Sequence, residues 1–149
     1  MGDNKIKPTE IQPDILIDKQ GWDEYWDVKE KKSGGSKLYD FIAEFYRKFI
    51  IRPTLNRFVY KYFLKESEVL HAGCGSGQVD KDIRSHVSIT GLDISKNALK
   101  IFNRENEGFC KSLHGSIFSI PLPDSSMEGI YNLGVMEHFD ETEIQKILS

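Results

Sequence analysis

The stretch Val69-Leu-His-Ala-Gly-Cys-Gly-Ser-Gly77 decides how this 149-residue chain folds. Its first residues are typical of a short buried strand, and three glycines at alternate positions then predict a tight turn into a helix. Glycine suits such a turn because it tolerates positive φ and, having no Cβ, lets the backbone approach a ligand closely. The stretch therefore predicts a ligand-binding strand-to-helix turn, with a tight turn that binds nothing as the alternative.

The spacing of these glycines excludes two common phosphate-binding motifs. The dinucleotide fingerprint G-x-G-x-x-G would place its third glycine at Gln78, and the chain has Gly77 instead. The Walker A motif needs a lysine followed by serine or threonine after its last glycine, where this chain has Gln78-Val79.

Strands and helices alternate on the C-terminal side of the glycine turn. The hydrophobic pattern predicts strands at 68–72, 87–93, 108–114 and 129–133, and helices at 79–85, 95–106 and from 140 onward. A capping box, Asp140-Glu-Thr-Glu143, opens the last helix. This alternation predicts the α/β class with a parallel sheet. Two helices are expected before the first strand, with apolar stripes at 38–49 and 55–63 interrupted by Pro53.

Asp93 ends the predicted second strand, 20 residues after Gly73. An acidic side chain at this position can accept hydrogen bonds from both hydroxyls of a ribose. The alternative is that Asp93 only helps to start the helix capped by Ser95. With the glycine turn at the right distance upstream, the ribose-binding role is the prediction.

A third block continues the pattern, from His114-Gly-Ser-Ile-Phe-Ser-Ile-Pro-Leu-Pro-Asp124 to Glu137-His-Phe139. Together, residues 68–139 resemble class I S-adenosylmethionine (SAM) dependent methyltransferases. The match is densest in the small-molecule group that includes ubiquinone-biosynthesis enzymes. The resemblance implies a Rossmann-like parallel sheet, of which the order 3-2-1-4 is present and the later strands are absent. It also implies SAM as the cofactor and a small molecule as the methyl acceptor.

The resemblance also implies which residues hold the cofactor. These are His71, Gly73, Cys74, Gly75, Asp93, Ile94, Ser116, Ile117 and Leu133. Two of them depart from the family pattern. The family usually has an acid at the position of His71, near the amino group of the methionine moiety, and an aspartate at the position of Ser116, near the adenine amine. Serine can still accept a hydrogen bond, but without the assistance of a charge, so weaker binding is expected.

No catalytic residue is assigned. A general base is needed only if the acceptor must lose a proton, and His138 is the candidate at the correct end of the sheet. Capping of the adjacent helix, or packing with Phe139, is the alternative for His138. Trp22, Tyr25 and Trp26 either form an aromatic lid over the cofactor or pack the N-terminal segment.

The domain organisation follows from these assignments. Residues 1–20 are expected to be a loosely held arm, and 21–149 a truncated SAM-binding domain with a helical cap at 21–66 and an α/β core at 67–149. The fourth strand would then be an open sheet edge. Such an edge predicts either self-association or a marginally stable monomer.

Composition and charge indicate which partners, metals and locations are expected. The net charge of −3 gives no reason to expect a nucleic-acid partner, and the basic stretch from Arg47 to Lys65 has the spacing of a solvated helix face. The two cysteines and four histidines lack metal-ligand spacing, so no metal is expected. No run approaches the ~18 apolar residues of a membrane span, and no signal peptide is visible, which predicts a cytoplasmic protein.

The sequence therefore predicts a SAM-dependent methyltransferase whose acceptor it does not identify. The alternative is a non-catalytic module that binds SAM or S-adenosylhomocysteine, or an inactive fragment. An NAD-linked oxidoreductase is a third interpretation, which Gln78 and the Glu137-His-Phe139 block disfavour.

Overall fold

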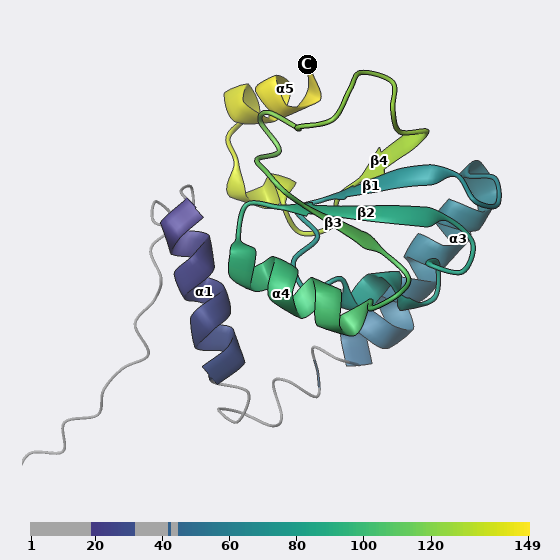
Figure 1. The fold of residues 1–149 in the computed structure, drawn as a ribbon, viewed down its shortest axis with the longest axis horizontal. Coiled ribbons are helices and arrows are strands. Elements are labelled where there is room, and N and C mark those ends of the chain that lie inside the picture. The colour runs from purple at the N-terminus through teal and green to yellow at the C-terminus, as the bar shows by residue number, and fades with distance from the viewer. Residues whose placement is uncertain (1–18, 32–41, 43–44) are drawn as a thin grey trace, which may run out of the picture.

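A four-stranded parallel sheet forms the centre of the computed structural model, which describes residues 19–31, 42 and 45–149. Its strands are β1 (Glu68–Ala72), β2 (Ser88–Asp93), β3 (Lys111–His114) and β4 (Gly129–Tyr131), in the order β3-β2-β1-β4 (Figure 1). The predicted α/β class and strand order are confirmed. The outer strands are shorter than predicted, because β3 begins only at Lys111 and β4 ends at Tyr131.

The two central strands are buried because their apolar residues meet helices. Val69 of β1 and Ile89 of β2 pack with Leu55 and Val59 of α3 (Arg52–Tyr62) and with Ile83. Each of these side chains is at most 7% exposed. This cluster holds β1 in place, and β1 carries the glycine turn at its end.

Helix α4 (Lys96–Glu105) follows β2 and matches its prediction closely. The hydroxyl of Ser95 caps it by accepting the backbone N–H of Ala98 at 3.1 Å. Its predicted inner face is buried, with Leu99 7% exposed and Phe102 fully covered.

The chain between β1 and β2 is not the regular helix predicted at 79–85. Only a short 3-10 helix, η3 (Gln78–Lys81), forms there. Beyond it, the carbonyl of Asp80 accepts the N–H groups of both Ile83 and Arg84, and the carbonyl of Ile83 accepts those of His86 and Val87. These shared acceptors make a series of turns that bring the chain quickly into β2.

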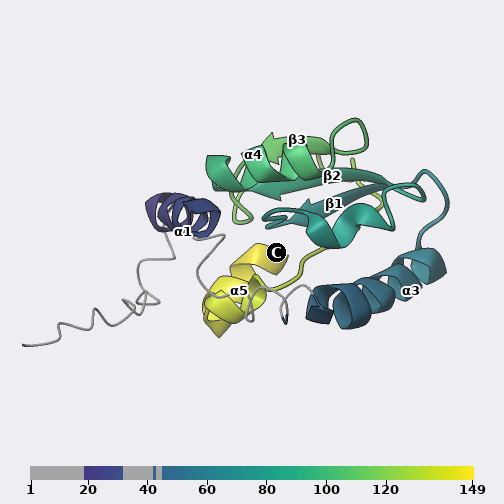
Figure 2. The ribbon, with the colours of Figure 1, turned by 90° about the horizontal axis from the view of Figure 1, so that it is seen from below.

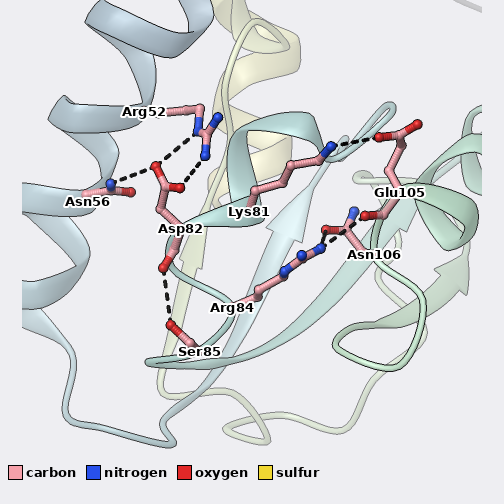
Figure 3. Close-up of polar contacts among 8 residues, drawn as sticks. All are labelled: Arg52, Asn56, Lys81, Asp82, Arg84, Ser85, Glu105 and Asn106. Carbon is pink, nitrogen blue, oxygen red and sulfur yellow. Dashed lines mark hydrogen bonds and ion pairs between the residues drawn. The ribbon is translucent and has the colours of Figure 1, made fainter.

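Polar side chains fix this short connection from two sides (Figure 3). On the α3 side, Asp82 accepts hydrogen bonds from the Arg52 guanidinium and, at 3.0 Å, from Asn56. The hydrogen bond from Arg52 lowers the pKa of Asp82. On the α4 side, Lys81 contacts Glu105 at 2.9 Å, and Arg84 donates to the Glu105 carbonyl at 3.0 Å. The segment that follows the glycine turn is therefore tied to both neighbouring helices.

The sequence predicted that Pro53 would interrupt the helix before β1, but the structure shows no interruption there. A π-helical turn, η2 (Arg47–Ile51), leads directly into α3, and Pro53 lies in the first turn of α3. The wide turn accommodates a proline that has no N–H and that would clash with the preceding turn of a regular helix. The hydroxyl of Thr54 donates to the Ile50 carbonyl at 2.8 Å.

Helix α1 (Lys19–Lys31) begins two residues inside the predicted N-terminal arm, and it contains the aromatic stretch. The rest of that arm, 1–18, and half of the predicted helix at 38–49, residues 38–41 and 43–44, lie outside the described residues. In Figures 1 and 2, α1 and α3 lie toward opposite ends of the sheet. Ser95 donates to Asp23 at 2.6 Å and Asn97 donates to Asp27 at 2.8 Å, so α1 docks beside the start of α4.

Strand β4 lies at one edge of the sheet and pairs with β1 alone. Ile130 in its centre is 59% exposed. The chain then turns through a 3-10 helix, η4 (Met136–His138), into α5 (Glu141–Leu148). The predicted capping box is confirmed, because Asp140 and Glu143 each accept the other's backbone N–H. Within the part of the chain that is described, no helix is long and apolar enough to cross a membrane.

Candidate functional site

A pocket of about 480 Å³ lies at the carboxyl ends of β1 and β2, between the glycine turn and α1. All nine residues predicted for the cofactor site line this pocket. They are His71, Gly73, Cys74, Gly75, Asp93, Ile94, Ser116, Ile117 and Leu133. They come from four separate segments, which the 3-2-1-4 strand order brings together.

The glycine turn forms the floor of the pocket, and two of its residues have no room for a side chain. A Cβ on Gly73, whose φ is +71°, would lie 2.4 Å from a methyl carbon of Val135. A Cβ on Gly75, at φ +51°, would lie 2.9 Å from the ring of Trp26. Both glycines also line the pocket, so packing against Val135 and Trp26 keeps side chains out of this part of its wall.

Asp93 joins the glycine turn to the start of α4. One carboxylate oxygen accepts the backbone N–H of Gly75, and the other accepts that of Ser95, each at 2.9 Å. Burial raises the pKa of Asp93, while these two hydrogen bonds oppose the rise. Each oxygen keeps a second lone pair, so the carboxylate can also accept hydrogen bonds from a diol in the pocket. The helix-starting role and the ribose-binding role of Asp93 are thus compatible.

His71 reaches the pocket from β1 and belongs to a buried polar cluster. Its Nδ1 lies 2.9 Å from Oδ2 of Asp80, and its ring stacks on Tyr131 at 4.5 Å between centroids. The Tyr131 hydroxyl donates to the other oxygen of Asp80 at 2.8 Å. Burial is the main cause that raises the pKa of Tyr131, with the Asp80 charge as the second cause, so Tyr131 stays protonated.

Ser116, after β3, and Leu133, after β4, line the pocket from the two outer strands of the sheet. The Ser116 hydroxyl accepts the N–H of Phe118 at 3.2 Å within its own loop, and Leu133 is 37% exposed after β4. Ser116 follows Gly115, whose N–H donates to the Asp93 carbonyl at 3.1 Å. This bond holds the loop that carries Ser116 beside the end of β2.

Three aromatic side chains of α1 close one side of the pocket. Trp22, Tyr25 and Trp26 all line it, and Trp26 is 9% exposed, against Gly75. Trp22 also meets the ring of His138 edge to face at 5.3 Å. These are packing contacts, and the role of the three aromatic residues as a lid over the cofactor stays a prediction. The role of His138 as a base stays a prediction.

Sequence reasoning missed three polar residues of this region. Arg47 lines the pocket from η2, and Asp80 and Tyr131 form the cluster behind His71. The spacing of Arg47 groups it with a basic helix face, and nothing in that spacing links it to the glycine turn. Asp80 is positioned by the η3 turn, and Tyr131 by the pairing of β4 with β1.

The cysteine thiols are structural in this setting. Burial raises the pKa of Cys74, and it raises that of Cys110 to about 11. Neither is a thiolate near neutral pH. Among the described residues, no three His, Cys, Asp or Glu side chains gather as metal ligands.

The parallel sheet in the order 3-2-1-4, with a pocket at its carboxyl edge, defines a Rossmann-like α/β domain. A family model described as a methyltransferase domain matches residues 70–149, more than half of the chain. The chain therefore belongs to the methyltransferase domain family, as its motifs predicted. These comparisons do not select the ubiquinone-biosynthesis group, which stays a prediction.

Solved structures agree on the fold. A proposed S-adenosyl-L-methionine-dependent methyltransferase from Methanococcus maripaludis aligns over 99% of this chain and 61% of its own, with 20% identity and a TM-score of 0.57. A TehB-like SAM-dependent methyltransferase from Corynebacterium glutamicum aligns over 62% and 50%, with 17% identity and a TM-score of 0.53.

A third similar structure is phosphoethanolamine N-methyltransferase 1 from Haemonchus contortus, in complex with phosphoethanolamine and S-adenosylhomocysteine. It aligns over 57% of this chain and 19% of its own, with 15% identity and a TM-score of 0.52. SAM, the predicted cofactor, is thus the one associated with these neighbours. This chain spans 61% or less of the length of each of the three proteins. No curated protein matches the chain.

Proposed function

We propose that this chain binds SAM in the pocket and transfers its methyl group to a small-molecule acceptor. The observation that carries the proposal is the placement of Asp93. Its carboxylate ends β2, contacts the glycine turn, and lines a pocket that all nine predicted residues share. We also propose that 21–149 act as one binding domain, because the cap at 21–66 contributes Trp22, Trp26 and Arg47 to the pocket of the core at 67–149.

The residues present suit each part of this cofactor. The side-chain-free backbone at Gly73 and Gly75 allows close approach, and Asp93 can accept from both ribose hydroxyls. Ser116 lines the pocket after β3, and its hydroxyl would accept from the adenine amine. Arg47 lines the pocket as a cation, which suits the carboxylate of the methionine moiety.

When bound, SAM supplies a methyl group that its sulfonium makes electrophilic. The chain then has to align the acceptor for in-line attack and keep water away. The aromatic side chains of Trp22 and Trp26 on one wall of the pocket exclude water there. An acceptor that must lose a proton would need a base, and His138 at the rim is the candidate.

Calorimetric titration tests the proposal directly. We expect SAM and S-adenosylhomocysteine to bind and NAD not to bind at the same concentrations. Saturation by NAD alone would overturn the proposal. Binding of SAM by a chain that transfers no methyl group to any of a panel of amine, hydroxyl and thiol acceptors would favour the non-catalytic module.

The Ser116→Asp variant is expected to bind SAM more tightly than the native chain, by about 0.5–1.5 kcal/mol. An aspartate can keep the hydrogen bond from the Phe118 N–H and present a charged oxygen to the adenine amine. Calorimetry on both proteins measures the difference. Ser119→Asp, three residues along the same loop and absent from the pocket lining, is the matched control and is expected to change nothing. Equal or weaker binding by a folded Ser116→Asp variant would show that Ser116 does not face the adenine.

The isolated chain is expected to self-associate or to fray at β4, because this edge strand exposes Ile130 and pairs on one side only. Analytical ultracentrifugation should then show a concentration-dependent mass, or hydrogen exchange should be fast at 129–148. Ile130→Lys should suppress association by placing a charge on the open edge. A monodisperse monomer with slow exchange throughout 129–148 would contradict this prediction.

A further inference from the structure

The cluster of His71, Asp80 and Tyr131 does more than fill the space beneath the pocket. Asp80 is fully buried and His71 is 2% exposed. A buried carboxylate is costly unless its oxygens are satisfied, and here each oxygen has one side-chain partner. Tyr131 can only donate to the carboxylate, so its bond direction is fixed.

The contact between Nδ1 and Asp80 determines whether the other ring nitrogen of His71, Nε2, donates or accepts a hydrogen bond. The carboxylate of Asp80 is acceptor-only, so Nδ1 of His71 must carry the proton that it shares with Oδ2. In the neutral imidazole, Nε2 is then a hydrogen-bond acceptor.

Nε2 of His71 has no hydrogen-bond partner among the described residues. The side-chain hydrogen bond of His71 there is made by Nδ1. Nε2 is also not fully buried. Asn56 Oδ1 is the one fully buried side-chain polar atom that lacks a partner in the described part of the chain. Nε2 therefore keeps contact with the pocket that His71 lines.

The remaining pocket charges indicate which ligand group meets this acceptor. Under the proposed function, Asp93 and Ser116 hold the nucleoside on the β2 and β3 side of the pocket, which leaves the β1 and β4 side for the amino-acid end of the cofactor. That end carries one carboxylate and one ammonium. Arg47 suits the carboxylate, which leaves the ammonium in need of an acceptor.

Resting on the proposed function, we infer that Asp80 and Tyr131 are positioning residues that hold His71 in the Nδ1–H tautomer, so that Nε2 accepts a hydrogen bond from the ammonium group of the bound cofactor. A ring supported by a buried carboxylate thus takes the place of an acid at position 71. The rival acceptor in the pocket is Glu137, an exposed carboxylate in the η4 turn after β4.

The test compares S-adenosylhomocysteine with its desamino analogue, which lacks only the amino group. The native chain should prefer S-adenosylhomocysteine by about tenfold to a hundredfold, the range of a hydrogen bond to a charged group. In Asp80→Asn, one amide oxygen must replace two carboxylate oxygens. The tautomer of His71 is then no longer enforced by two acceptor oxygens, so the preference should fall by about fivefold or more, while affinity for the desamino analogue changes little.

Two control variants separate this role from a general loss of structure. Asp82→Asn makes the same change two residues away, on a carboxylate that bonds to Arg52 and Asn56, and it should leave the preference intact. Glu137→Gln should also leave it intact. Loss of the preference in Glu137→Gln, or an unchanged preference in Asp80→Asn, would overturn the inference. If neither ligand binds the native chain, the proposed function itself fails.

Nitrogen-15 NMR of the His71 ring gives a second measurement that needs no destabilising variant. The native chain should show a protonated Nδ1 and an unprotonated Nε2, and Nε2 should shift with S-adenosylhomocysteine but not with the desamino analogue. Tyr131→Phe keeps the ring stack and the carboxylate but removes one hydrogen bond, so it should weaken the preference less than Asp80→Asn. A protonated Nε2 in the native chain would overturn the assignment.

Discussion

Gly77→Ala should lose about 2–6 kcal/mol of folding free energy, because it combines left-handed backbone strain with overpacking of the core. Gly77 has φ +63°, and a Cβ there would lie 2.4 Å from Phe102 and 2.6 Å from Asn106. Both neighbours are buried, and Asn106 donates to the Gly77 carbonyl at 3.3 Å. Moving either side chain away would cost packing free energy. Urea denaturation followed by circular dichroism measures the loss.

Two other glycines separate the two contributions. Gly108 has φ +76°, and a Cβ there would meet nothing within 4 Å, so Gly108→Ala should report backbone strain alone, about 1 kcal/mol. Gly91 lacks a positive φ, yet a Cβ there would lie 2.5 Å from Phe102, so Gly91→Ala should report the packing cost. Gly77→Ala should exceed both. A Gly77→Ala chain as stable as Gly108→Ala would show that Phe102 yields its place, and that α4 does not hold the glycine turn.

The parts of the fold that sequence predicts well are those whose causes are local. Helix α4 is an example, since the Ser95 cap and the spacing of Ala98, Leu99 and Phe102 all lie within one segment. The glycine turn and Asp93 are similar, because the strand ends that carry them must meet at one edge of a parallel sheet. For this reason the nine residues predicted from the motifs all line one pocket, and their contacts with a cofactor stay a prediction.

The missed features depend on contacts between distant segments. Tyr131 stacks on His71 because the two residues face each other in the β1–β4 register, 60 positions apart in the chain. Asp80 reaches that pair only because the predicted helix is a 3-10 turn that side chains of α3 and α4 hold in place. Arg47 enters the pocket through a π-helical turn before Pro53, where a break was predicted. Periodicity carries no information on such pairings.

Asp93→Ala should weaken SAM binding by about 1.5–3 kcal/mol, which is the range for hydrogen bonds to a charged group. The structure adds a second consequence. The variant also leaves the N–H groups of Gly75 and Ser95 without their acceptor, so it should lose stability as well. Ser95→Ala is the matched control, since it removes the α4 cap and the bond from Ser95 to Asp23 but keeps the Asp93 carboxylate. It should cost about 1 kcal/mol of stability and leave SAM binding nearly unchanged.

The ligand can be varied to isolate the ribose contact from these structural effects. The native chain should bind S-adenosylhomocysteine much more tightly than its 2′,3′-dideoxy analogue, and Asp93→Ala should bind the two about equally. Because burial raises the pKa of Asp93, protonation on acidification begins at a higher pH than for an exposed aspartate. The native preference for the diol should fall over that same range, since a protonated carboxyl accepts more weakly. If Asp93→Ala retains the full preference for the ribose diol, the carboxylate serves only the glycine turn and the start of α4, and the ribose is held elsewhere in the pocket.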